Sequence, residues 1–271
     1  MKNSLNYKIL DCTLRDGGYY NNWNFSFRLI QDYLNLIGKT NIEYVELGFR
    51  GFYKNKNIGL TGYTDDNLIN KLNFPESLKI GVMVNASDLF KNNLSPLKNL
   101  KRLFPNINKK ISFVRFACHY DEIFGLRDCI RWLSQNRVSV FINIMQISEI
   151  NLDKLKKVCL NLSKTNVEAL YFADSLGALE IKKFKKFIQL TDKYWKKDLG
   201  LHAHDNLNLA LKNSKFAIKN NFRWIDCTIM GMGRGPGNLK TEEILKKVDR
   251  EQVKKIKTLK IKYFEDLRKK Y

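Results

Sequence analysis

The sequence predicts an α/β protein, a (β/α)8 (TIM) barrel in a single domain that is followed by a C-terminal helix. Strand-like and helix-like segments alternate eight times along the 271 residues, which is the count of this barrel. The strand-like segments are dense in Val, Ile, Phe and Leu, as expected for a parallel sheet that is covered on both faces. The chain contains only four prolines, so the helical segments run without interruption.

The expected elements follow one another without a low-complexity linker or an internal repeat. We predict strands at Lys8–Thr13, Ile42–Phe49, Lys79–Val84, Ser112–Cys118, Val138–Met145, Val167–Ala173, Leu199–His204 and Trp224–Ile229. We predict helices near residues 27–38, 65–72, 88–103, 121–136, 151–164, 179–195, 206–220 and 241–248. The barrel is therefore assigned to residues 1–248.

Residues 249–271 are expected to form a basic amphipathic helix. Its apolar positions are Val253, Ile256, Phe264 and Leu267. Such a helix can pack on its own barrel or bind a partner protein, and we expect it to pack on the barrel. The longest irregular stretch is 50–64, whose glycines and aromatic residues suit a mobile cover over a site.

Composition and charge narrow the class of protein. With 44% hydrophobic residues the chain is typical of a globular protein. It shows no apolar run of membrane-spanning length and no signal-peptide-like start, so we expect a cytoplasmic protein that does not enter a membrane. The five cysteines form no C-x-x-C pair and are interpreted as small buried hydrophobic residues.

The net charge of +21 is the unusual feature of the composition. A basic surface attracts anions, including nucleic acids. The lysines are scattered over the expected helices, however, and no basic stripe interleaved with aromatic residues occurs. We therefore expect a small anionic substrate rather than a nucleic acid.

Polar side chains gather where several predicted strands end. His202 and His204 alternate with Ala203, so both imidazoles project to the same side of an extended strand. Asp16 follows the first strand and Asn238 follows the eighth, and closing the barrel makes these strand ends neighbours. Two imidazoles with oxygen ligands suit Mn²⁺, Mg²⁺, Co²⁺ or Zn²⁺ in an open, catalytic site. The alternative is a pair of ordinary polar histidines at the mouth of the barrel.

Arg15 and Glu46 belong to the same sector of strand ends. An arginine beside a metal can bind a carboxylate through two parallel hydrogen bonds, and Glu46 would hold Arg15 in place. The glycines of residues 231–237 let the backbone approach a ligand closely.

These residues lie in motifs that together resemble the DRE-TIM metallolyase family. This is the family of hydroxymethylglutaryl-CoA lyase, isopropylmalate and homocitrate synthases, and 4-hydroxy-2-oxovalerate aldolase. The motifs are Thr13-Leu14-Arg15-Asp16-Gly17, Val45-Glu46-Leu47-Gly48-Phe49, His202-Ala203-His204 and the glycine-rich segment that runs from Gly231 to Asn238. Two further stretches, 114–119 and 171–178, are most similar to the aldolase branch. The resemblance spans residue 8 to about residue 245.

The resemblance implies a divalent cation held by Asp16, His202 and His204, with Asn238 in or near its coordination shell. Mn²⁺ or Mg²⁺ is the first choice, and Co²⁺ or Zn²⁺ the second.

The same resemblance implies roles for other residues in the reaction. Arg15 would stabilise a metal-bound enolate, and Glu46 would orient Arg15. Ser175 matches the position that hydrogen-bonds the keto-acid carboxylate in the aldolases, and His119 is expected as a polar wall residue that contacts the substrate.

The chain departs from the patterns of this family in three ways. Tyr19 stands where the aldolases have a histidine general base. Because a phenol has an ordinary pKa near 10, it needs a nearby cation such as the metal or Arg15 to act as a base at neutral pH. The C-terminal extension that docks a dehydrogenase and the catalytic cysteine loop of the lyases are both missing. We therefore expect an aldolase-like enzyme that consists of the barrel alone.

The resulting hypothesis is a metal-dependent aldolase or lyase, or the reverse condensation, that acts through the enolate of a small 2-oxo acid such as pyruvate. The charge favours an anionic co-substrate, such as a sugar derivative, beside a simple aldehyde. One alternative is a Claisen-type synthase or lyase that uses an acyl-CoA. Another is an inactive barrel that binds anionic partners. Whether the protein forms a homodimer stays open.

Overall fold

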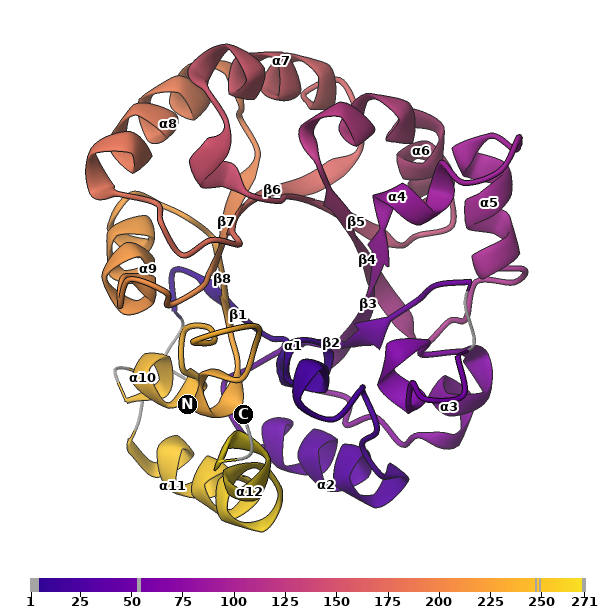
Figure 1. The fold of residues 1–271 in the computed structure, drawn as a ribbon, viewed down its shortest axis with the longest axis vertical. Helices are drawn as coiled ribbons and strands as arrows, with labels where there is room; N and C mark the ends of the chain where they lie inside the picture. Colours follow the sequence, from indigo (N-terminus) through magenta and orange to yellow (C-terminus); the bar gives the residue numbers. More distant parts are fainter. Residues whose placement is uncertain (1–4, 53–54, 247, 249, 270–271) are drawn as a thin grey trace.

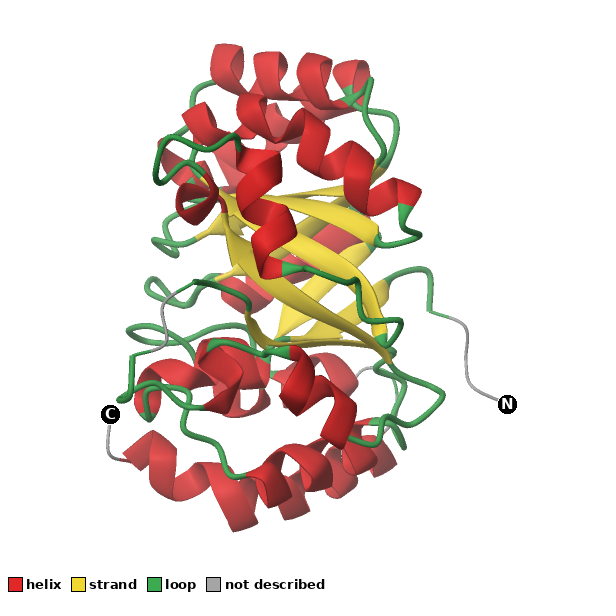
Figure 2. Cartoon of the chain, turned by 90° about the vertical axis from the view of Figure 1, so that its right-hand side faces the viewer, coloured by secondary structure: helices red, strands yellow, loops and turns green. Residues whose placement is uncertain are grey.

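The chain folds into a closed barrel of parallel strands in the order β1 to β8, which confirms the predicted (β/α)8 fold. The computed structural model describes residues 5–52, 55–246, 248 and 250–269. The strands form a ring that the helices surround (Figure 1), and the side view shows helices on both sides of the sheet (Figure 2). No helix of the described residues is long and apolar enough to cross a membrane.

The strands are β1 (Lys8–Asp11), β2 (Tyr44–Phe49), β3 (Lys79–Asn85), β4 (Ile111–Cys118), β5 (Ser139–Ile144), β6 (Val167–Asp174), β7 (Asp198–Ala203) and β8 (Trp224–Cys227). The α-helices are α1 (Thr13–Asp16), α2 (Phe27–Ile37), α3 (Asp66–Lys71), α4 (Ala86–Leu89), α5 (Pro96–Leu103), α6 (Arg127–Gln135), α7 (Leu152–Leu162), α8 (Ile181–Tyr194), α9 (Ala210–Lys219), α10 (Thr241–Leu245), α11 (Arg250–Leu259) and α12 (Glu265–Lys269). A π-helical turn, η6 (Lys260–Phe264), separates the last two. The 3-10 turns are η1 (Gly17–Tyr20), η2 (Leu60–Gly62), η3 (Tyr120–Leu126), η4 (Ile147–Glu149) and η5 (Ile229–Gly231).

The first strand ends two residues earlier than predicted. The carboxylate of Asp11 accepts a hydrogen bond of 2.9 Å from the N–H of Thr13, and this local bond turns the chain into α1. The eighth strand also ends early, at Cys227, because the N–H of Ile229 donates to the hydroxyl of Thr13 at 2.8 Å rather than to a strand. Asp16 consequently stands on a helical turn above the sheet.

Alternation along the strands sorts side chains between two cores. Side chains on one face pack against the helices. Side chains on the other face fill the barrel, where an aromatic layer closes the end at which the strands begin. This layer contains Tyr44, Phe113, Phe141, Tyr171 and Trp224. Gly81 and Gly200 make room for it, since a Cβ at either position would lie within 2.6 Å of the ring of Phe113 or Tyr171. The aromatic layer lies inside the barrel beneath the site.

The C-terminal segment packs beside α2. α11 contacts α2, as Figure 1 shows. Ile256 and Phe264 are buried, whereas Val253 and Leu267 are partly buried against the main core. These four apolar residues thus face the protein, whereas Ile261 on the same segment is exposed.

Candidate active site

A small cavity opens at the carboxyl ends of the strands, where a barrel of this kind builds its active site. Its volume is about 90 Å³. The lining residues come from all eight strands or the loops after them: Arg15, Asp16, Tyr19, Phe49, Met83, Asn85, Ala117, Asn143, Met145, Ala173, Ser175, His202, His204 and Arg234. Most of the residues predicted for the site therefore meet in one place.

The four predicted metal ligands are close together and buried. Oδ2 of Asp16 lies 3.3 Å from Nε2 of His202 and accepts a hydrogen bond of 2.6 Å from Nδ2 of Asn238. The ring centroids of His202 and His204 are 5.2 Å apart. A backbone bridge between His204 and Asn238 joins the end of β7 to the glycine-rich loop after β8. The structure thus brings possible nitrogen and oxygen ligands from three parts of the chain close to one another.

The protonation states of these residues suit a cation. Burial, together with the charge of the neighbouring His202, lowers the pKa of His204 to about 3, so His204 is neutral. Burial raises the pKa of Asp16, but the Arg15 cation and His202 outweigh this effect and hold it well below its usual value. Asp16 is therefore ionised, which is the ligand form of a carboxylate.

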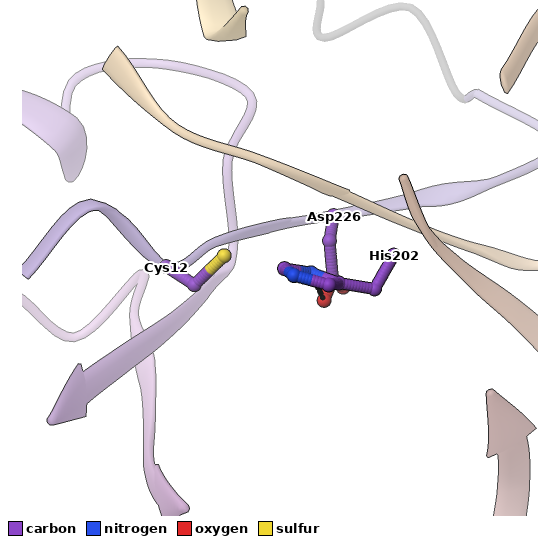
Figure 3. Close-up of side chains that lie close together, drawn as sticks. All are labelled: Cys12, His202 and Asp226. Atoms are coloured by element: carbon purple, nitrogen blue, oxygen red, sulfur yellow. Dashed lines mark hydrogen bonds and ion pairs between the residues drawn. The ribbon is translucent and has the colours of Figure 1, made fainter. Parts of the chain in front are cut away.

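His202 is held in one orientation by a residue that the sequence analysis did not name. Nδ1 of His202 lies 2.8 Å from Oδ2 of Asp226 on β8. This contact directs Nε2 toward Asp16, in the way that a carboxylate orients a metal-binding histidine. Cys12 lies beside both residues (Figure 3), and possible ligand atoms of the three are within 4.8 Å of one another. Burial raises the pKa of the Cys12 thiol well above its usual value, so the thiol is protonated at neutral pH in the metal-free protein.

At the base of the cavity, charged side chains of alternating sign contact one another and form a closed ring. Nε of Arg15 donates to Glu46 at 2.7 Å, and the Arg15 guanidinium also contacts the carboxylate of Asp16. The other oxygen of Glu46 lies 3.3 Å from Nε of Arg115, which in turn donates through Nη2 to Asp226 at 2.6 Å. Asp226 and Asp16 are then linked through His202. Each member is at most 5% exposed, so the ring positions Arg15 and His202 rigidly.

Arg15 keeps one donor for a ligand. Its Nη2 is buried and has no hydrogen-bond partner among the described residues, while Nε and Nη1 are engaged by Glu46 and Asp16. A buried N–H without an acceptor is costly. Since Arg15 lines the cavity, a substrate oxygen can satisfy it.

Tyr19 lines the cavity beside Arg234, whose guanidinium carbon is 5.6 Å from the tyrosine ring centroid. Burial raises the pKa of Tyr19, and the charge of Asp16 raises it further. Arg15 and Arg234 oppose these effects without overcoming them. The two arginines therefore do not bring the pKa of this phenol below its usual value, as a general base at neutral pH would require.

Ser175 and His119, both predicted to contact substrate, have different positions. Ser175 is half-buried in the cavity wall, where its hydroxyl accepts a hydrogen bond of 3.2 Å from the N–H of Gln146. His119 is exposed and holds the N-cap of η3, with its backbone N–H bonded to Glu122 at 2.7 Å. It is not among the described residues that line the cavity, so it is not carried into the proposed site.

Arg115 and Asp226 belong to the site although no ligand or catalytic motif predicts a role for them. The signal that identifies them is a charged residue inside an apolar strand, as in Phe113-Val114-Arg115-Phe116 and Trp224-Ile225-Asp226-Cys227. Buried charges are almost always paired. Two such residues of opposite sign therefore indicate an ion pair inside the barrel.

The sequence and the fold match known proteins. The model of the HMGL-like family matches residues 104–267. The chain is 24% identical over 237 residues to 4-hydroxy-2-oxovalerate aldolase 2 of Rhodococcus jostii, covering 86% of this chain and 66% of that protein. It is 24% identical over 253 residues to the 4-hydroxy-2-oxovalerate aldolase of Bacillus cereus, covering 90% of this chain and 70% of that protein. The chain thus spans about two thirds of the length of these relatives.

Two solved structures show the same architecture. The N-terminal domain of a "putative aldolase" from Bacteroides vulgatus superposes with a TM-score of 0.84 and 31% identity, over 96% of this chain and 87% of that chain. The HMG-CoA lyase of Bacillus subtilis superposes with a TM-score of 0.76 and 14% identity, over 97% of this chain and 95% of that one. At that identity the second match concerns the fold alone.

Proposed function

The chain belongs to the HMGL-like family, and from this premise we propose that it is a divalent-metal-dependent carbon–carbon lyase of the aldolase type, working in either direction. Its donor is the enolate of a small 2-oxo acid, with pyruvate as the smallest example. The single observation that carries the proposal is the buried Nη2 of Arg15, which has no hydrogen-bond partner among the described residues. Arg15 lines the cavity together with Asp16, His202 and His204.

The residues of the cavity fit a divalent cation. Asp16 offers an ionised oxygen and His204 a neutral nitrogen, while His202 presents Nε2 because Nδ1 faces Asp226. The side-chain oxygen of Asn238 is buried and has no hydrogen-bond donor among the described residues. This mixed set suits Mn²⁺, Mg²⁺, Co²⁺ or Zn²⁺ without selecting one of them. A cation there would supply Lewis acidity toward the keto oxygen of the substrate.

The protein residues bind and orient the substrates and donate a proton to the product. Arg15 donates to the oxygen on which negative charge develops, and Glu46 fixes the plane of its guanidinium. Ser175 lies at the cavity wall, where its hydroxyl can donate to the carboxylate of the 2-oxo acid. Tyr19 stays protonated at neutral pH because its pKa is raised. It therefore serves as a proton donor to the aldehyde-derived oxygen rather than as the base.

Deuterium exchange tests this function without knowledge of the second substrate. An enolate that forms without an electrophile must be reprotonated by solvent, so pyruvate in D₂O should gain deuterium at C3 faster with protein and Mg²⁺ than with Mg²⁺ alone. Arg15→Ala should lower the excess rate by about 10²–10³-fold, because it removes a preorganised donor. Mass spectrometry of quenched samples measures the exchange.

Arg131→Ala is the control, since Arg131 is exposed on α6 and pairs only with Asp128 among the described residues. It should exchange at the wild-type rate. A metal-loaded wild-type protein that gives no excess exchange would contradict the pyruvate donor and shift support to an acyl-CoA donor.

A further inference from the structure

The cavity wall opposite the proposed metal ligands carries two carboxamides. Asn85 ends β3 and Asn143 lies on β5. Both pair in register with Ala117 on the strand between them, so the three residues stand at one height. β3, β4 and β5 lie across the ring from β7, β8 and β1 (Figure 1). The small Ala117 side chain leaves space between the two amides.

Asn143 is buried with one polar atom that has no partner in the part of the chain that the structure describes. It is 2% exposed, and its Oδ1 has no hydrogen-bond donor among the described residues. Its neighbours Ile142 and Ile144 belong to the core on the helix side of the sheet, whereas Phe141 fills the barrel. Asn143 therefore faces inward, and it lines the cavity. A buried carbonyl without a donor is unfavourable unless a ligand or a water molecule binds to it.

The side chain of Asn85 likewise does not hydrogen-bond to the helix that begins next to it. It occupies the N-cap position of α4, but its side chain makes no capping hydrogen bond to that helix. The side chains around the two amides on this wall, Met83 and Met145, are apolar. Hydrogen bonding on this wall thus depends on the carboxamides.

We propose that Asn143, with Asn85 beside it, binds a hydroxyl group of the electrophile, so that the enzyme acts on small 2-hydroxyaldehydes in preference to unsubstituted aldehydes. This inference rests on the proposed function. A hydroxyl both donates and accepts, so it satisfies the amide of Asn143 in either orientation of its oxygen and nitrogen. A cavity of about 90 Å³ restricts the substrates to small molecules.

The reaction balances without a redox step. In the condensation, C3 of the 2-oxo acid loses a proton and forms a bond to the aldehyde carbon, whose oxygen gains a proton. The hydroxyl that Asn143 binds is a spectator on the next carbon. Asn143 therefore determines specificity and does not take part in bond formation.

A competition between two aldehydes of the same size tests the inference. Glycolaldehyde and propanal differ by a hydroxyl in place of a methyl group, and each is offered at equal concentration with pyruvate, Mg²⁺ and the protein. The product ratio, corrected for Mg²⁺ alone, reports the ratio of the two kcat/KM values and does not depend on how much of a variant is folded. Wild type should favour the glycolaldehyde product, and Asn143→Leu should lower the ratio by about tenfold or more.

The neighbouring Met145→Leu is the matched control, because it changes the same wall without removing a polar group, and it should keep the wild-type ratio. Equal ratios for wild type and Asn143→Leu would overturn the inference and assign the amide to a bound water. If pyruvate still exchanges deuterium in that case, the proposed function stands. If neither exchange nor condensation occurs, the proposed function has failed first.

A binding measurement covers that last case. Saturation-transfer NMR with pyruvate-loaded protein compares ethane-1,2-diol with propan-1-ol, which cannot react. The diol should give the stronger signal, and Asn143→Leu should remove the difference. The absence of a difference in the wild type would overturn the inference independently of catalysis.

Discussion

His202 and His204 are separated by one alanine, yet their surroundings assign them different tasks. His202 lies between two carboxylates, Asp16 and Asp226. His204 is held neutral by burial and by the nearby His202. Two histidines at a barrel mouth with no ligand to bind would not need such an arrangement, because exposed imidazoles are satisfied by water. The contrast supports a metal rather than an ordinary polar pair.

His204→Ala tests the proposed metal ligands directly. The variant should fold and lose nearly all of its bound metal, because a site of three or four ligands loses a neutral nitrogen donor. Elemental analysis after dialysis against Mn²⁺ or Mg²⁺ gives the metal content per chain.

Two control variants separate the proposed ligands from their neighbours. His119→Ala removes the exposed histidine of η3, and Cys12→Ala removes the thiol beside His202. Both should retain the metal. Loss of metal in Cys12→Ala together with its retention in His204→Ala would assign the ion to Cys12, His202 and Asp226 instead.

At the scale of the elements, the site depends on three members of the ring of alternating charges, which form a charged layer inside the barrel. β2, β4 and β8 each contribute one residue to it, namely Glu46, Arg115 and Asp226. The Arg115 guanidinium carbon also lies 4.4 Å from the ring centroid of Tyr171 in the aromatic layer below. The carboxylates outweigh burial and raise the pKa of Arg115 above its usual value. Through this charged layer, the packing of the three strands fixes the positions of Arg15 and His202.

Arg115→Met should destabilise the protein by about 3–5 kcal/mol, because it leaves Glu46 and Asp226 buried without their shared cation. Urea unfolding of the metal-free protein measures the loss. The surface variant Arg131→Ala breaks an exposed pair with Asp128 and should cost only about 0–1 kcal/mol. A similar small loss in Arg115→Met would show that the charged layer does not depend on this arginine.

At the same scale, the loop after β2 is held by contacts at both of its ends. We expected residues 50–64 to form a mobile cover, and residues 53–54 lie outside the described part of the chain. The ends of the loop are anchored: Arg50 is buried and pairs with Asp66 at 2.9 Å. The hydroxyl of Thr61 donates to the carbonyl of Leu14 at 3.1 Å, next to the site. The first contact ties the loop to α3, and the second ties it to α1, which carries Arg15.

For the whole molecule, the two site histidines make folding stability depend on pH with opposite signs. The folded pKa of His204 is about 3, against about 6.5 in an unfolded chain. The unfolded chain therefore binds more protons between these values, and stability falls as the pH is lowered from about 6.5 toward 3. Asp16, whose folded pKa is lowered, adds to the loss below about pH 4. Burial lowers the pKa of His202, but Asp16 outweighs it and the net shift is upward, so its contribution is lost as the pH rises above about 6.5.

Urea unfolding of the metal-free protein between about pH 4 and pH 8 checks this dependence. His204→Gln should flatten the acid side of the profile, because it removes the group that the unfolded chain protonates. His119→Gln should keep the wild-type profile. An unchanged acid slope in His204→Gln would mean that other groups cause the acid sensitivity.

The sequence alone determined the architecture and the sector of the barrel that holds the site. The alternation of strand-like and helix-like segments is a local property, and the count of eight leads to a closed barrel. Closure then implies that residues after β1, β7 and β8 are neighbours, which placed Asp16, His202, His204 and Asn238 together before any coordinates were known.

Only the tertiary structure decided which side chains face one another. Arg115 and Asp226 are 111 residues apart, and their pairing depends on strand register and barrel closure, which no local pattern encodes. The same is true of Asn85 and Asn143, which share a height only because each pairs with Ala117. His119 follows its strand as the site residues do, but a local N-cap turns it outward. Spacing along the chain states which strand end a residue occupies, whereas its direction and its partners are set by contacts between strands that are distant in sequence.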